Sequence, residues 1–309
     1  MEKRVELSLL MDFYGPLLTE KRRDVMRLYC DEDMGLQEIA DRLEISRQGV
    51  YDAVKTAAAA LEHIDDIQSR EFTCEGKYVA SDGEIICNGT HGTLSFDEAL
   101  AKSCNSVFSQ IAIELGPEIL TAQAEKMGFN QNFKADGFSY YGGQFHVENA
   151  SQSELGWAGI GQYNDMASPF NMMTIAGGVA GGGSAVAPRI IQTSKSPLGL
   201  PTTVQLWTNT RSMMGADTAS ILSDMMKDAA VHTFGSGFLS EYGLHCKTGT
   251  AEVQSGEAPH SWLVGFLEDE TAPLAFAIVV ENGGSASTTT RSIAQKVLTV
   301  AADEVRKEG

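Results

Sequence analysis

Two short clusters of residues in this sequence could carry chemistry on a peptide. Lys247-Thr248-Gly249-Thr250 combines a cation, two hydroxyls and a position without a side chain, so it could hold a carboxylate while an extended peptide approaches the backbone. About 140 residues earlier, Ser103 and Asn105 offer a hydroxyl and a carboxamide that could pass protons to, and orient, a neighbouring lysine or nucleophile. Each cluster alone also fits a structural role, as an exposed strand end or a helix cap.

Strand and helix patterns in the last 240 residues would position these clusters. Strand patterns occupy residues 244–253, 262–268 and 274–281. Helix patterns begin at Ser95, Ser168 and Asp217, and a long one runs from Arg291 to Arg306. Lys247 therefore lies on the first strand, and Ser103 lies at a break within the first helical stretch, 95–115. Strands with helices on both flanks predict an α/β or α+β layer fold.

The first 62 residues have a different pattern, that of four short helices. Apolar residues recur at helical spacing in these segments, and small Ala40 would lie where the third and fourth helices cross. Only Glu44-Ile45 separates those two helices, the fourth of which would begin at Ser46 and run unbroken to about residue 62. This arrangement is typical of a helix-turn-helix, in which Arg47, Gln48 and Lys55 would face nucleic acid. A plain helical bundle fits the same pattern.

Composition limits the classes of function. The 309 residues predict about two domains, and 23 Lys and Arg against 41 Asp and Glu give a formal charge of −18. That balance disfavours a chain that holds nucleic acid mainly by neutralising phosphates, and keeps the plain bundle open. The longest apolar runs are too short to cross a bilayer, so we expect a cytoplasmic protein. Five cysteines are too few for a disulfide scaffold, and in an unexported chain they predict reduced thiols. Neither a Cys-x-x-Cys nor a His-x-x-x-His pair occurs, so we expect no metal, and we expect no cofactor.

The N-terminal segment resembles a known family. Met11-Asp12-Phe13-Tyr14, Leu18-Thr19-Glu20-Lys21, Glu38-Ile39-Ala40 and Ser46-Arg47-Gln48-Gly49-Val50-Tyr51-Asp52 are similar to the YlxM family of small bacterial proteins, over about residues 5 to 61. The resemblance implies a fold similar to the promoter-reading helix-turn-helix of sigma factors. It also implies a cytoplasmic role linked to nucleic acid or to the signal recognition particle.

The rest of the chain resembles the penicillin-binding protein transpeptidase domain. The order Ser-x-Asn and then Lys-Thr-Gly-Thr carries the resemblance, which runs from about residue 57 to the end. Accompanying landmarks in sequence order include Phe72-Thr73-Cys74, His91-Gly92, Gly159-Ile160-Gly161-Gln162 and Ser261-Trp262. The resemblance implies a three-layer, β-lactamase-like fold. It also implies an enzyme that cross-links peptidoglycan stem peptides through a serine acyl-enzyme and that reacts with β-lactams. It assigns catalytic roles to Ser103, Asn105 and Lys247, and substrate binding to Lys247, Thr248, Gly249 and Thr250.

The chain departs from that family at the nucleophile. The family requires Ser-x-x-Lys at the start of a helix, and no lysine of this sequence has a serine three positions before it. Residues 56–62 are similar to the alanine-rich tail of the nucleophile helix, so the end of the helix-turn-helix has taken the nucleophile's place. The family is membrane-anchored and extracytoplasmic, whereas here its anchor and first strands are expected to be missing. We therefore expect little or no transpeptidation and an incomplete antiparallel sheet.

These observations predict an α+β chain in two domains, a helix-turn-helix module over 1–62 and a truncated transpeptidase domain over 63–309. Ser103, Asn105, Lys247 and Thr248 should converge, and the strand at 274–281 should have an unpaired side that favours self-association. Three interpretations of function stay open. The chain is an impaired transpeptidase-type protein, a cytoplasmic regulator that binds nucleic acid or the signal recognition particle through residues 1–62, or a fusion without a selected function.

Overall fold

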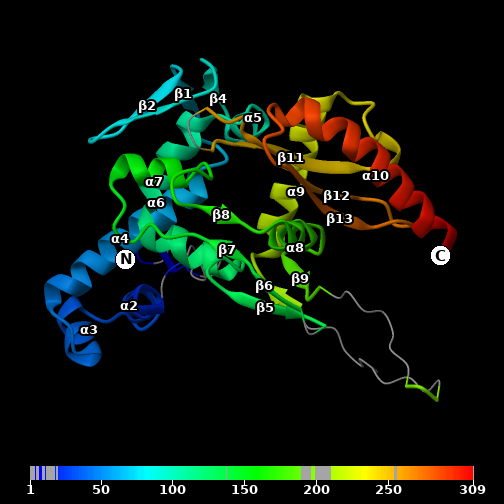
Figure 1. The fold of residues 1–309 in the computed structure, drawn as a ribbon. Helices are drawn as coiled ribbons and strands as arrows, with labels where there is room; N and C mark the ends of the chain where they lie inside the picture. The colour runs from blue at the N-terminus through cyan, green and yellow to red at the C-terminus, as the bar shows by residue number, and fades with distance from the viewer. Residues whose placement is uncertain are drawn as a thin grey trace. The chain divides into compact units, whose positions relative to one another are not determined.

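The computed structural model describes residues 4, 7, 8, 11, 18, 20–136, 138–188, 196–198, 210–253 and 256–308 (Figure 1). The chain divides into two compact units, each made of several stretches of sequence. Unit 1 comprises Met1–Ala99, Cys104–Gln123 and Val147–Ile160, and unit 2 comprises Leu100–Ser103, Ala124–His146 and Gly161–Gly309. The predicted domain boundary near residue 62 separates segments that resemble two different families, whereas the two units are defined by contacts within the fold. That boundary therefore stays a prediction.

Unit 1 begins with the predicted helix-turn-helix. Its helices are α2 (Glu20–Cys30), α3 (Leu36–Leu43) and α4 (Arg47–Asp66). The turn between α3 and α4 contains Glu44 in the left-handed region, with φ of 54°. The helices share a core of Val25, Leu28, Ile39, Ala40 and Val50. Ala40 is buried, and its small side chain lets the helices approach closely, as predicted.

The predicted unbroken helix at 46–62 is confirmed, because α4 runs without a break to Asp66. The Ser46 hydroxyl accepts a hydrogen bond from the backbone N–H of Gly49 at 3.0 Å, so Ser46 caps the helix start as predicted. The helix predicted around residues 7–14 lies mostly outside the described residues, although residues 7, 8 and 11 are helical. The side chains of Arg47, Gln48 and Lys55 are all exposed.

The rest of unit 1 contains two small antiparallel pairs, one complete helix and most of two others. Strand β1 (Phe72–Cys74) pairs with β4 (Gly92–Leu94), and β2 (Lys77–Val79) pairs with β3 (Glu84–Ile86). The helices are α5 (Phe96–Ala101), α6 (Asn105–Lys126) and α7 (Gln152–Ala158). The capping box before α5 is confirmed, since Ser95 and Glu98 exchange hydrogen bonds between side chain and backbone N–H. Helix α6 is kinked at Gly116, whose φ of 80° suits a residue without a Cβ.

Helix α6 joins the two parts of unit 1. Near its start, Val107 and Ile111 pack with residues of β1 and β4. Further along, Ile119 is buried against Leu7, Leu18 and Met26 of the helix-turn-helix module and against Ala57 of α4. The module is therefore packed onto a transpeptidase helix inside one compact unit, without a Pro-, Gly- or Ser-rich spacer.

Unit 2 contains the main sheet. Its short strand pairs are β5 (Asn132–Ala135) with β6 (Phe138–Tyr141), β7 (Gly143–Gln144) with β8 (Met166–Ala167), and β9 (Ser184–Val186) with β10 (Thr210–Ser212). Its helices are α8 (Pro169–Ala180), α9 (Ala216–Phe234), a 3₁₀ helix (Ser240–Tyr242) and α10 (Ala286–Glu308). Strands β11 (Leu244–Ala251), β12 (His260–Leu267) and β13 (Leu274–Val280) form an antiparallel sheet in that order.

Helices cover both faces of this sheet, which gives the predicted three layers. On one face, α10 contributes Ala294, Leu298 and Ala302 to a core that includes Leu263 and Phe276. On the other face, α8 and α9 pack against Phe266 of β12 and Ala275 of β13 (Figure 1). Strand β13 pairs with β12 alone among the described residues, so the predicted incomplete sheet is also found. Self-association through that edge stays a prediction.

Among the described helices, none combines the length and the apolar character that a membrane span requires.

Candidate active site

Lys247 lies in the middle of β11, where the pleat decides the direction of its side chain. Leu244 and Cys246 belong to the core under α10, so the alternation of a strand places Lys247 on the opposite face of the sheet. Lys247 is paired in register with Val264 of β12. A lysine in this position is held by a regular strand and backed by a buried residue, Cys246.

The Lys247 ammonium contacts Ser103, as the sequence predicts. Its Nζ donates to the Ser103 hydroxyl and to the Thr248 carbonyl, the latter at 2.7 Å. Both Ser103 and Lys247 belong to unit 2, although they lie 144 positions apart in the sequence. Convergence of these two predicted site residues is therefore confirmed.

Ser103 reaches Lys247 from a strained backbone. Its φ of 52° lies in the left-handed region, which serine adopts rarely. The residue sits just after α5, where its N–H bonds the Leu100 carbonyl at 3.1 Å and closes the helix. Left-handed residues other than glycine concentrate at functional sites, where surrounding contacts offset the strain. The sequence places a helix break here but gives no sign of this conformation.

Burial changes the titration of the lysine. It lowers the pKa of Lys247 to about 8, and the neighbouring Cys246 offsets this in part. The ammonium is therefore easier to deprotonate than an exposed lysine, and near neutral pH it remains mostly charged. An amine with such a pKa can bind an anion below pH 8 and accept a proton above it.

The remaining residues of the Lys-Thr-Gly-Thr cluster lie on β11, an edge strand of the described sheet. Thr248 and Gly249 are half-buried and Thr250 is exposed. Strand β11 pairs only with β12 in the described part of the chain, so backbone groups along its other side have no strand partner there. The Thr250 carbonyl accepts a hydrogen bond from Gln162 Nε2 at 3.5 Å. An outer strand of this kind can add an extended peptide by β-augmentation.

Asn105 lies in unit 1, at the first turn of α6. Its Nδ2 donates to the Ile86 carbonyl at the end of β3, at 2.9 Å. The carboxamide thus secures the end of that strand to the start of α6. Its predicted part in catalysis rests on the Ser-x-Asn motif and stays a prediction.

Two protein families match the chain. The penicillin-binding protein transpeptidase domain matches residues 54–299, and the YlxM / p13-like helix-turn-helix protein family matches residues 1–67. The chain is 50% identical over 66 residues to a UPF0122 protein of Clostridium kluyveri, which covers 21% of this chain and 60% of that protein. It is 27% identical over 204 residues to the peptidoglycan D,D-transpeptidase PbpA of Mycolicibacterium smegmatis, covering 63% of this chain and 40% of that protein.

Solved structures share the fold. Penicillin-binding protein A from M. tuberculosis, in a ceftriaxone acyl-enzyme complex, matches with a TM-score of 0.71 and 24% identity over 80% of this chain and 59% of that one. The D,D-transpeptidase domain of a peptidoglycan glycosyltransferase from Eggerthella lenta matches with a TM-score of 0.69 and 22% identity, over 81% and 64%. The chain spans less than two thirds of the length of each of these relatives. The chain thus belongs to the penicillin-binding protein transpeptidase family, with a YlxM-like helix-turn-helix module fused in front of the transpeptidase fold.

Proposed function

We propose that the transpeptidase fold of this chain binds stem peptides ending in D-alanyl-D-alanine, and β-lactams, without forming an acyl-enzyme efficiently. The observation that carries this proposal is the hydrogen bond that Lys247, on the edge strand β11, donates to the Ser103 hydroxyl. The Lys247 ammonium would pair with the carboxylate of the ligand, and the hydroxyls of Thr248 and Thr250 would add hydrogen bonds to it. The free side of β11 would hold the extended peptide backbone.

Covalent chemistry is the part of the family's activity that this sequence does not support. No lysine is preceded at the third position by a serine, so the usual nucleophile and its activating lysine are missing from the sequence. Ser103 would hold Lys247 in position. Asn105 would help to orient a neighbouring lysine, a role that the Ser-x-Asn motif alone supports. Binding and acylation should therefore separate in this chain, which makes binding the informative measurement.

Replacing Lys247 with alanine is expected to weaken binding of a D-alanyl-D-alanine stem peptide by roughly 10- to 150-fold, the usual contribution of a hydrogen bond to a charged group. Isothermal titration calorimetry of the full chain would measure this change. Because the pKa of Lys247 is about 8, the bound carboxylate loses its charged partner as pH rises through that value. Affinity should accordingly be highest below pH 8 and fall above it, and the Lys247→Ala variant should lack this dependence.

The control is Lys296→Ala, which removes the same charge from an exposed position on α10. Its affinity and pH profile should match those of the unmodified chain. Equal binding by Lys247→Ala and by the unmodified chain would contradict the proposal.

A second candidate function belongs to the helix-turn-helix module, which we propose binds nucleic acid, including the RNA of the signal recognition particle. The observation that favours it is one exposed face of α4, where Arg47, Tyr51 and Lys55 follow one another at four-residue spacing. Two cations could contact phosphates and the tyrosine could stack on a base. Gln48 is less available, since its amide donates to Asp52 at 2.9 Å.

Combined Arg47→Ala and Lys55→Ala substitutions are expected to weaken binding of labelled RNA and to make it less sensitive to salt. Each lost phosphate contact lowers the slope of log affinity against log salt by about 0.9 for a duplex. Fluorescence anisotropy with the particle RNA and with duplex DNA of equal length would measure both effects and distinguish the two nucleic acids. Lys296→Ala again serves as the control, and failure of the unmodified chain to bind either probe at low salt would rule the function out.

A further inference from the structure

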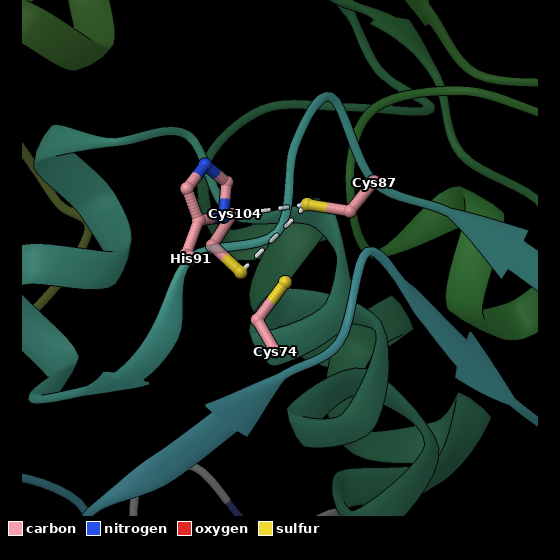
Figure 2. A group of neighbouring side chains, drawn as sticks. All are labelled: Cys74, Cys87, His91 and Cys104. Carbon is pink, nitrogen blue, oxygen red and sulfur yellow. Dashed lines mark hydrogen bonds between the residues drawn. The ribbon is translucent and has the colours of Figure 1, made fainter.

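Four side chains from separate segments of unit 1 converge outside the site described above. Cys74 ends β1, Cys87 follows β3, His91 precedes β4 and Cys104 precedes α6. Their sulfur and ring nitrogen atoms all lie within 4.8 Å of one another, and Figure 2 shows the three sulfurs directed toward a common point. The three thiols are buried and free of disulfides, and His91 is half-buried.

The spacing of these atoms fits a tetrahedral ion. With Zn–S near 2.3 Å and Zn–N near 2.0–2.1 Å, tetrahedral angles require about 3.8 Å between two sulfurs and about 3.6 Å between a sulfur and a nitrogen. The Cys87 and Cys104 sulfurs are 3.8 Å apart, and the Cys87 sulfur is 3.6 Å from His91 Nδ1. These two ligand pairs thus have the separations of a zinc site, and every other pair lies within 4.8 Å.

We propose that Cys74, Cys87, His91 and Cys104 bind one Zn²⁺ ion in a closed structural site. Three thiolates and one imidazole at tetrahedral spacing favour zinc over the hard cations, which prefer oxygen ligands. Four protein ligands leave no position for water, so the ion has a structural rather than a catalytic role. Binding releases the thiol protons to solvent, and the ion takes their place among the sulfurs.

Outer contacts already favour a thiolate at Cys74. Burial raises the pKa of this thiol, but hydrogen bonds from the Ser106 hydroxyl and from the backbone of His91 and Gly76 outweigh burial and bring the pKa to about 6. The Ser106 oxygen lies 3.4 Å from the Cys74 sulfur and is itself buried. Burial raises the pKa of the Cys104 thiol to about 12.

The ion would secure the chain where the Ser-x-Asn motif begins. Cys104 is the residue between Ser103 and Asn105, and its sulfur meets ligands from β1 and from the β3–β4 connection. The backbone N–H of Cys87 also donates to the Gly76 carbonyl at 2.9 Å, which links two of the ligand segments. Zinc would thereby fix the start of α6 to the small strands of unit 1.

Metal analysis of the full chain, purified under reducing conditions and dialysed, is expected to find about one zinc per chain. Replacing zinc with Co²⁺ should produce thiolate-to-cobalt charge transfer and the visible absorption of a tetrahedral ion. Cys87→Ser and His91→Gln should each lower the zinc content well below one. Cys30→Ser, which changes a cysteine of α2 outside the cluster, is the matched control and should retain the zinc.

Loss of zinc in a ligand variant could also result from misfolding, so a second variant keeps all four ligands. Ser106→Ala removes a hydrogen bond to the Cys74 sulfur, and outer-shell losses of this kind weaken metal binding by about 10- to 100-fold. Competition with a chromophoric chelator would measure that loss. A folded, reduced chain that takes up no added zinc, full zinc retention in Cys87→Ser, or a disulfide among the cluster cysteines in the purified chain would overturn the proposal.

Discussion

A fluorescent penicillin is expected to leave no covalent label on this chain under conditions that label a transpeptidase carrying Ser-x-x-Lys. Loss of a serine nucleophile has lowered turnover by about six orders of magnitude where it was measured in a serine protease. In the proposed binding mode Lys247 and Thr248 would hold the ligand, but neither would supply the serine nucleophile that bond formation requires. Gel fluorescence and intact-mass spectrometry after the same incubation would detect an adduct.

The control for this experiment is Ser103→Ala, because Ser103 carries the hydroxyl that contacts Lys247. Both forms should remain unlabelled, and calorimetric titration of the unmodified chain with the same penicillin would show that the compound reaches the site. An adduct on the unmodified chain that disappears in Ser103→Ala would mean that Ser103 acts as a nucleophile with Lys247 as its base. That result would contradict impairment while leaving the binding proposal intact.

Long elements with clear patterns could be predicted from the sequence, and short ones could not. The strands predicted at 244–253, 262–268 and 274–281 are found within a few residues of those bounds, because the last two are largely apolar and the first begins with Leu244 and Cys246 alternating with polar residues. Strands β1 to β4 have three residues each, too few for an alternating pattern to be recognised in the sequence. Three of the four residues of the Cys-His cluster lie in or beside these small strands, since Cys74 ends β1, Cys87 follows β3 and His91 precedes β4.

The candidate site shows the same limit at the level of single residues. Contact between Ser103 and Lys247 could be expected only from the resemblance to a family, because nothing local in either segment refers to the other. The left-handed backbone of Ser103 depends on its surroundings and has no sequence signal. The Cys-His cluster contains no Cys-x-x-Cys or His-x-x-x-His pair, and its nearest ligands in the sequence, Cys87 and His91, meet Cys74 and Cys104 only through strand pairing and the start of α6.

Ile119→Ala is expected to lower the local unfolding free energy of the helix-turn-helix module by about 2–5 kcal/mol, the usual cost of removing most of a buried isoleucine. Ile119 is 3% exposed and packs against Met26 of α2 and Ala57 of α4. The loss would fall on α2 and α4, because the cavity lies between them and α6. Hydrogen exchange with mass spectrometry should show faster amide exchange in both helices and little change in β1 and β4.

The matched control is Ile86→Ala, which makes the same change in the same unit at a side chain that is 54% exposed. Its effect should stay within about 0.5 kcal/mol, as is usual for surface positions. Unchanged exchange in α2 and α4 of the Ile119→Ala variant would mean that the module is stable without α6 and is only tethered to it. Faster exchange would mean that the YlxM-like module depends for its stability on α6, a helix whose start packs on the small strands of unit 1.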